Sequence, residues 1–268
     1  MVEAVPPPVV IFQEGHVETD GFQIRCMEAG RGNPVVMLDS MKWGLSKLHD
    51  ALAQKNRAVV LELPGFGSSP TNTRSQSVQD LANTMTQAAA KVVRNRYTLI
   101  GTSFGANVAL WQTLQAPDEV ECLILVSPTA ILPVDHPTSN TPQQMADRLF
   151  AHPEKVLGLP YVDPAILVKE QALVQRLKGA THDAEAESRL SEIHCATLIV
   201  FGLKDQMVAS EAARVYWEKI PNCNVSLVYD TGHIIVAERP EALINVVADY
   251  VERRETFIVG HQNNMINP

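Results

Sequence analysis

The chain has 268 residues, of which 46% are hydrophobic and 19% are charged, and its formal net charge is −8. This composition is typical of a soluble globular protein and excludes collagen-like and disordered chains. The acidic balance argues against nucleic-acid binding, which requires a basic surface, and against docking on anionic membranes.

Cysteine content and the N-terminal sequence indicate the compartment. None of the four cysteines forms a CxxC pair, and in a chain of this length they are expected to be free thiols rather than disulfides. The first residues, MVEAVPPPVVIF, lack the basic and apolar regions of a signal peptide. No apolar run approaches the ~20 residues that cross a bilayer. We therefore expect a cytoplasmic protein with no membrane association.

Strand-like and helix-like stretches alternate along most of the chain. An N-terminal hairpin is predicted around the Asp20-Gly21 turn. Apolar runs that predict strands follow at 34–38, 58–63, 97–101, 121–127, 196–202 and 224–230. Helices are predicted between them, at about 45–54, 77–93, 104–115, 209–219 and 239–252. Because the runs are continuously apolar, we expect a parallel α/β sheet with helices on both faces.

One interval breaks this alternation. Residues 128–194 contain no strand-like run, many prolines, and helix-like pieces such as TPQQMADRLF and PAILVKEQALVQRLKG. We interpret them as a helical cap inserted into a core domain that comprises residues 1–127 and 195–268. The tail after Arg254 has little pattern and is left unassigned.

A serine lies where a strand meets a helix. In YTLIGTSFGANVAL, Ser103 stands between Gly101 and Gly105, directly before a predicted helix. Glycines there allow a strand and a helix to approach closely, which exposes the serine hydroxyl at the carboxyl edge of the sheet. The N–H of Phe104, at the start of that helix, can stabilise an oxyanion. GxSxG alone is a weak pattern, so a plain Gly/Ser turn remains the alternative, and the spacing does not fit a nucleotide-binding loop.

A nucleophilic serine needs a base and an acid that orients the base. Asp205 follows the run ATLIVFG, and His233 follows the run NVSLVYD, so each comes just after a predicted strand. This agreement favours Ser103, His233 and Asp205 as nucleophile, base and acid. The alternatives are that Asp205 caps the next helix, that Asp135 is the acid, and that His233 is an ordinary loop residue. The histidines show no metal-ligand spacing, so no metal is expected.

These motifs resemble the α/β-hydrolase superfamily over roughly 20–252. The resemblance rests on GTSFG at 101–105, Asp205 in GLKDQMV, His233 in DTGHIIVAERPE, and LELPGFGSSP, in which Glu62 stands in place of the usual Asp. It implies a mostly parallel eight-stranded sheet, a helical cap between strands six and seven, and serine-based acyl chemistry without a cofactor.

One departure from the family pattern lies after the strand at 34–38. Asp39-Ser40 stands where such proteins usually carry His-Gly, and by position Met41 would supply the second oxyanion N–H. An ionised Asp39 that pointed inward would oppose an oxyanion. We expect Asp39 to turn away and accept hydrogen bonds from backbone N–H groups of its own loop.

The expected partner is a small-molecule substrate. Candidate pocket residues are Trp43, Phe150, Leu157 and Tyr161, whose apolar character favours a small hydrophobic acyl group or ring, although they could equally form the core of the cap. An ester, a lactone, a thioester and the carbon–carbon bond of a diketone all fit the proposed chemistry. A lyase or perhydrolase on the same site, and a non-catalytic binding protein on the same scaffold, are the alternative functions. The sequence indicates no oligomeric state.

Overall fold

A computed structural model describes residues 10–131, 142–155, 159–178, 182–256 and 266–267. Its centre is a sheet in the order β1-β2-β4-β3-β5-β6-β7-β8-β9. The strands are β1 (Gln13–Thr19), β2 (Phe22–Ala29), β3 (Pro34–Asp39), β4 (Arg57–Glu62), β5 (Tyr97–Thr102), β6 (Val120–Val126), β7 (Ala196–Gly202), β8 (Cys223–Val228) and β9 (Ile266–Asn267).

The sheet is parallel except at one edge. β1 pairs with β2 and β2 with β4 in antiparallel fashion, whereas every pair from β4 to β9 is parallel. Asp20 and Gly21 both have positive φ, 51° and 72°, as the tight turn of the predicted β1–β2 hairpin requires. The mostly parallel eight-stranded sheet is confirmed, and β9, in the unassigned tail, adds a two-residue strand at the far edge.

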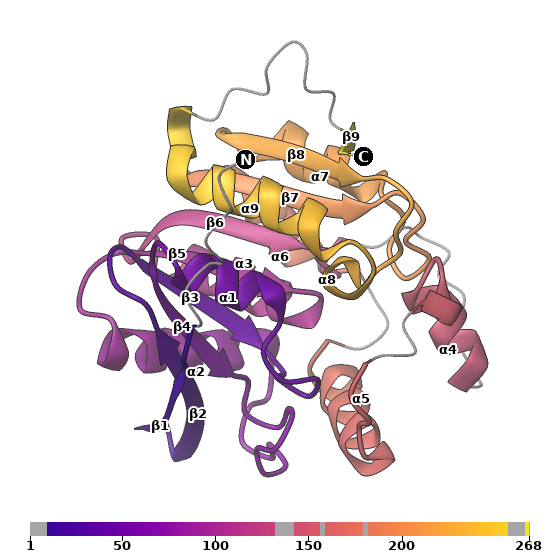
Figure 1. Ribbon diagram of the computed structural model, residues 1–268. Coiled ribbons are helices and arrows are strands. Elements are labelled where there is room, and N and C mark those ends of the chain that lie inside the picture. Colours follow the sequence, from indigo (N-terminus) through magenta and orange to yellow (C-terminus); the bar gives the residue numbers. More distant parts are fainter. Residues whose placement is uncertain (1–9, 132–141, 156–158, 179–181, 257–265, 268) are drawn as a thin grey trace, which may run out of the picture.

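Helices cover both faces of the sheet (Figure 1). On one face, α1 (Lys47–Ala53), α8 (Ile235–Glu238) and α9 (Pro240–Arg253) pack on the strands. On the other face lie α2 (Val78–Val92), α3 (Phe104–Gln115), α6 (Ala184–Arg189) and α7 (Ala212–Lys219). Sheet residues therefore alternate between two cores. In β3, Val35 and Met37 enter the first, and Val36 and Leu38 enter the second.

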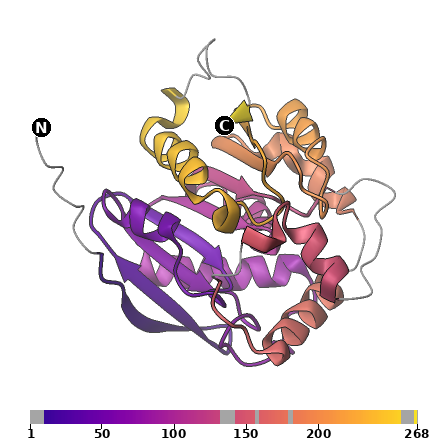
Figure 2. The same cartoon turned by 45° about the vertical axis from the view of Figure 1, so that its right-hand side comes forward.

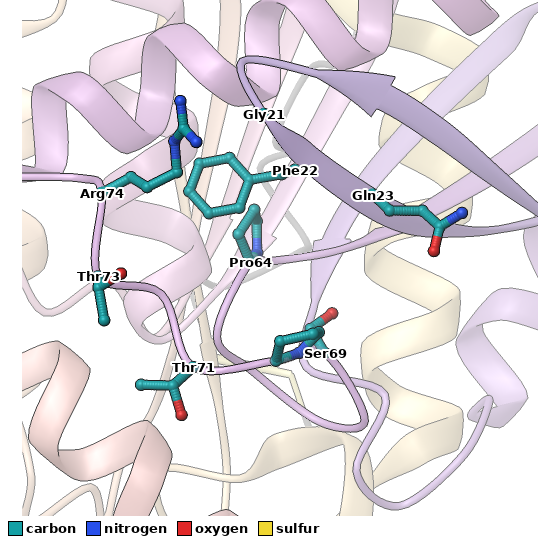
Figure 3. A pocket seen from close by; sticks show the side chains of 9 residues that line it. Gly21, Phe22, Gln23, Pro64, Ser69, Thr71, Thr73 and Arg74 are labelled. Atoms are coloured by element: carbon teal, nitrogen blue, oxygen red, sulfur yellow. The ribbon is translucent and has the colours of Figure 1, made fainter.

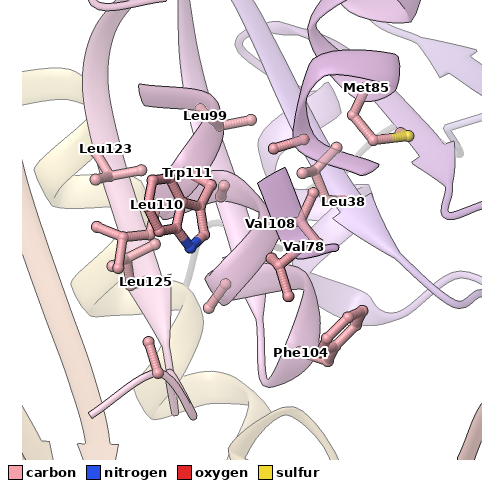
Figure 4. Close-up of a cluster of buried hydrophobic side chains, with 14 of the residues drawn as sticks. Leu38, Val78, Met85, Leu99, Phe104, Val108, Leu110, Trp111, Leu123 and Leu125 are labelled. Carbon is pink, nitrogen blue, oxygen red and sulfur yellow. The ribbon is translucent and has the colours of Figure 1, made fainter. Parts of the chain in front are cut away.

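The core beneath α2 and α3 holds the start of α3 in place. Trp111 is 1% exposed, and its indole N–H donates to Asp183 Oδ2 at 2.8 Å. Leu38, Leu99 and Leu125 of the sheet pack in the same cluster, which extends to Phe104 at the first turn of α3 (Figure 4). A continuous apolar cluster of this kind gives a rigid base for whatever the carboxyl edge of the sheet carries.

The segment between β6 and β7 contains α4 (Pro142–Leu149), the 3₁₀ turn η1 (Pro153–Lys155), α5 (Pro164–Lys178), α6 and the turn η2 (Leu190–Glu192). α4 and α5 lie beyond the arrowheads of the parallel strands, at their carboxyl ends (Figures 1 and 2). This is the edge at which α/β sheets place their binding sites. The short turn η3 (Arg254–Thr256) follows α9.

Candidate active site

Ser103 occupies a strained corner between β5 and α3. Its φ and ψ are 54° and −117°, a conformation that few residues other than glycine adopt. The corner is tight because a Cβ at Gly101 would lie 2.4 Å from the Gly105 carbonyl oxygen. A Cβ at Gly105 would lie 2.6 Å from the Leu38 carbonyl oxygen, so α3 begins directly against the end of β3. These contacts explain why glycine stands on both sides of the serine.

The structure brings Ser103, His233 and Asp205 into one hydrogen-bonded chain. Ser103 Oγ lies 2.8 Å from His233 Nε2, and His233 Nδ1 lies 2.8 Å from Asp205 Oδ2. An ionised carboxylate only accepts hydrogen bonds, so Nδ1 carries the proton and Nε2 is free to accept from the Ser103 hydroxyl. His233 is 1% exposed and Asp205 is 8% exposed, while Ser103 is partly exposed.

Asp205 is fixed by its own loop as well as by the histidine. Its Oδ1 accepts hydrogen bonds from the backbone N–H groups of Met207 at 2.8 Å and Val208 at 2.9 Å. The sequence also allowed Asp205 to cap the next helix, but α7 begins at Ala212 with Glu211 at its N-cap. Oδ1 of Asp205 therefore serves a turn within its own loop, while Oδ2 faces the histidine. The rival acid Asp135 lies outside the described residues.

The backbone of His233 is held from two sides. Its N–H donates to the Leu149 carbonyl at 2.9 Å, and its carbonyl accepts from the Ser127 hydroxyl at 2.9 Å. Ser127 is fully buried at the end of β6 and has a φ of 47°. The sequence offered no sign of either contact, because Ser127 and Leu149 reach His233 only through the fold.

Phe104 and Met41 are the residues whose backbone N–H groups the sequence predicts for an oxyanion site. Phe104 is the first residue of α3, so its N–H has no acceptor within the helix. Met41, in the loop after β3, has a φ of 50°. Asp39 Oδ1 accepts from the N–H of Ser40 at 2.6 Å and from that of Met41 at 3.4 Å. The prediction that Asp39 bonds its own loop is confirmed, and its bond to Met41 is the weak one.

A buried histidine, His49, contacts the Asp39 carboxylate. His49 Nδ1 accepts the N–H of Ser46 at 2.8 Å, and its Nε2 lies 3.5 Å from Asp39 Oδ2. Burial lowers the pKa of His49 below its usual value, with Asp39 acting in the opposite direction. A neutral His49 with its proton on Nε2 satisfies both contacts.

The predicted pocket residues have different surroundings. Trp43 is partly buried, with the Lys42 ammonium 5.0 Å from its ring centre. Phe150 is also partly buried, and its backbone packs against Gly232, next to His233. Tyr161 is 85% exposed, so its ring faces solvent and does not line a cavity, contrary to the prediction. Leu157 lies outside the described residues.

A surface hollow of about 200 Å³ lies elsewhere, between the β1–β2 hairpin and the loop after β4 (Figure 3). It is lined by Phe22, Pro64, Ser69 and Arg74, among others, and contains none of the residues that the sequence predicts for the site. The guanidinium of Arg74 lies 5.8 Å from the Phe22 ring centre and closes one side of it. Its shape and lining give no reason to move the candidate site from the serine.

Two general features bear on cofactors and membranes. Among the described residues, no group of three or more His, Cys, Asp or Glu side chains is placed to hold a metal ion. Within the same part of the chain, no helix is long and apolar enough to cross a membrane.

Comparisons with known proteins agree with this architecture. The chain is 23% identical over 240 residues to the uncharacterized hydrolase YugF of Bacillus subtilis, covering 80% of this chain and 86% of that one. It is 23% identical to the pimeloyl-[acyl-carrier protein] methyl ester esterase of Nitrosomonas europaea, covering 86% and 96%. The structure of Est816, described as an N-acyl homoserine lactone degrading enzyme, superposes with a TM-score of 0.73 at 20% identity, covering 88% and 100%.

The family itself is shown by a match over most of the chain. Residues 33–246 fit the sequence profile of the alpha/beta hydrolase family, from the start of β3 into α9. The match spans β5, α3 and the loops after β7 and β8, where the serine, aspartate and histidine lie. The chain therefore belongs to the alpha/beta hydrolase family, and it is an enzyme of the α/β-hydrolase type.

Proposed function

We propose that this enzyme is a serine hydrolase that cleaves a small, largely apolar carbonyl substrate through Ser103, His233 and Asp205. The observation that carries the proposal is the unbroken chain of 2.8 Å contacts from Ser103 Oγ through His233 to Asp205. A serine hydroxyl is a weak nucleophile until a base of this kind removes its proton. A turn-forming serine with no chemical role would need neither partner.

The proposed reaction has two steps. His233 Nε2 accepts the Ser103 proton as Oγ attacks the carbonyl carbon, and Asp205 stabilises the imidazolium that forms. The N–H groups of Phe104 and Met41 bind the oxyanion. His233 then returns the proton to the leaving group, and an acyl-enzyme remains. Water, activated by His233, releases the acid and restores the serine hydroxyl.

Apolar side chains around the serine favour a hydrophobic acyl group. The rings of Phe66 and Phe104 stack with 5.6 Å between their centres, and both are nearly buried. Trp43 and Phe150 are candidates for the opposite walls. We further propose that α4 and α5, within residues 128–194, form a cap over this site, whereas α6 packs on the face of the sheet with the core of 1–127 and 195–268. Esters, lactones, thioesters and diketones remain the substrate classes, and the named esterase and lactone-degrading relatives place esters and lactones first in a screen.

A labelling experiment tests the proposal. A fluorophosphonate probe reacts with an activated serine, so we expect mass spectrometry to find its adduct on Ser103 of the wild-type protein. The Ser103→Ala and His233→Ala variants should be folded and unlabelled, and they should not hydrolyse p-nitrophenyl acetate. Ser188→Ala, which removes an exposed hydroxyl that donates to the Glu185 carbonyl on α6, is the matched control and should label normally. A folded wild-type protein without an adduct would refute the proposal and favour a non-catalytic binding role.

A further inference from the structure

A buried carboxylate on α5 connects two loops of the core domain. Glu170 is 4% exposed, although it lies on a helix whose other face is open to solvent. Its Oε2 lies 2.5 Å from the Lys42 ammonium, and its Oε1 accepts the Gly67 N–H at 2.9 Å. A carboxylate is rarely buried unless it is paired in this way. Glu170 therefore holds α5 against the core through two specific contacts.

Both partners of Glu170 belong to loops that border the candidate oxyanion site. Lys42 directly follows Met41, whose N–H is the proposed second donor. Gly67 packs on the same loop, since a Cβ at Gly67 would lie 2.2 Å from the Ser40 carbonyl oxygen. Its neighbour Phe66 stacks on Phe104, the residue of the first proposed donor. Glu170 thus contacts the surroundings of both donors at once.

The loop after β3 needs such support. Met41 has a φ of 50°, a strained conformation that persists only when neighbouring contacts enforce it. Within the loop, the Met41 N–H has only the long 3.4 Å contact to Asp39, and the Lys42 N–H has a 3.3 Å contact to Ser40 Oγ. The 2.5 Å ion pair between Lys42 and Glu170 is a shorter contact, and it comes from outside the loop.

We propose that Glu170 is a positioning residue that holds the Met41 N–H in place for the oxyanion, so that docking of α5 completes the oxyanion site. This inference rests on the proposed serine hydrolase function. Glu170 touches neither Ser103 nor His233, and it acts through Lys42 and Gly67. The catalytic step should therefore depend on a helix that lies more than 60 residues away in sequence from Ser103.

Glu170→Gln and Lys42→Met each remove the ion pair between Lys42 and Glu170, one by changing the acid and the other by changing the base. Glutamine has the size of glutamate and can still accept the Gly67 N–H, but its NH₂ group would face the Lys42 ammonium. Complete removal of an oxyanion donor costs ~10²–10³ in kcat. Because the variants loosen the donor and do not delete it, we expect kcat for p-nitrophenyl acetate to fall about 10- to 100-fold, with KM within about twofold. Lys42→Arg keeps the positive charge beside Glu170, so it should retain most of the wild-type kcat.

Two further measurements separate positioning from general docking of the helix. Arg176, also on α5, ties the helix to the Ser75 and Asn72 carbonyls, away from the Met41 loop. Arg176→Gln should therefore keep kcat within about twofold of the wild type. The pH at which kcat/KM is half-maximal should be unchanged in all variants, because none of them alters Ser103, His233 or Asp205. Circular dichroism checks that each variant is folded, and Lys42→Met serves as the test if Glu170→Gln does not fold.

The outcomes are distinct from those of the labelling experiment. A wild-type protein that is neither labelled nor active refutes the proposed function, and this inference with it. An active wild type whose kcat is unchanged in Glu170→Gln and Lys42→Met overturns the inference alone. An equal loss in Arg176→Gln also overturns it, because docking of α5 in general would then be the cause.

Discussion

Replacing Asp205 by asparagine changes one oxygen to an NH₂ group at nearly constant size. The structure determines which way the new amide faces. Oδ1 accepts two backbone N–H groups, those of Met207 and Val208, so the amide oxygen must stay there. The NH₂ group then takes the place of Oδ2, 2.8 Å from His233 Nδ1.

This orientation inverts the hydrogen bonding of the histidine. With a donor facing it, Nδ1 must become an acceptor, and the proton of the neutral ring moves to Nε2. Nε2 then points a donor at Ser103 Oγ and cannot remove its proton. The variant should keep the geometry of the three side chains and lose the base.

The size of the effect follows from two estimates. Loss of the correct tautomer at a site of this type lowers kcat by about 10⁴, equivalent to about 5 kcal/mol in the barrier. The amide could escape by flipping, which would leave two buried N–H groups without acceptors at about 1–3 kcal/mol each. At a total of about 2–6 kcal/mol, no more than a few per cent of molecules would be flipped. We therefore expect kcat to fall by between about 30-fold and about 10⁴-fold.

The assay compares kcat for p-nitrophenyl acetate in the wild type, Asp205→Asn and Asp80→Asn. Asp80 is a surface carboxylate at the start of α2, and its variant should be fully active. Circular dichroism establishes that the variants are folded. A kcat for Asp205→Asn within tenfold of the wild type would refute the reasoning and direct attention to another acid, with Asp135 first.

Two other predictions concern stability. In Gly105→Ala, the new Cβ would lie 2.6 Å from the Leu38 carbonyl oxygen, so α3 must shift from β3; we expect the free energy of unfolding, measured in urea, to fall by about 1–3 kcal/mol, and a loss below about 0.5 kcal/mol would contradict the contact. Burial lowers the pKa of His49 in the folded protein. Its contribution to stability is therefore complete above the unfolded pKa of about 6.5 and is lost as the pH falls from that value through the lower folded pKa. His49→Gln can still accept the Ser46 N–H but has no titrating ring. Its urea midpoint should therefore fall less between pH 7 and pH 5 than that of the wild type. An equal fall in the two proteins would contradict this role of His49.

The sequence was sufficient to predict the sheet because its central strands are buried on both faces. A run such as ATLIVFG can be recognised as a strand without knowledge of its neighbours, because a strand buried on both faces must be apolar at every position. The serine, aspartate and histidine were predictable for a related reason. In a parallel sheet, residues just after successive strands meet at one edge whatever their separation in sequence.

Contacts that depend on how the helices of 128–194 dock could not be predicted. Glu170 and Lys42 are 128 positions apart, and nothing in PAILVKEQALVQRLKG distinguishes Glu170 from a solvated surface acid. Tyr161 is the opposite case: because it is aromatic we predicted it in the pocket, and the structure places it at the surface. Docking direction is set by packing against the core, which local sequence patterns do not encode.

The backbone bond between Leu149 and His233 bears on how such enzymes can be recombined. The Leu149 carbonyl accepts the N–H groups of both His233 and Ile234, and the His152 N–H donates to Glu238 shortly beyond them. The end of α4 is therefore built into the histidine loop. A chimera that exchanged residues 128–194 for those of a relative would replace the backbone contact that holds His233, the proposed base. Module boundaries for such grafts are better drawn so that Leu149–His152 and the histidine loop come from one parent.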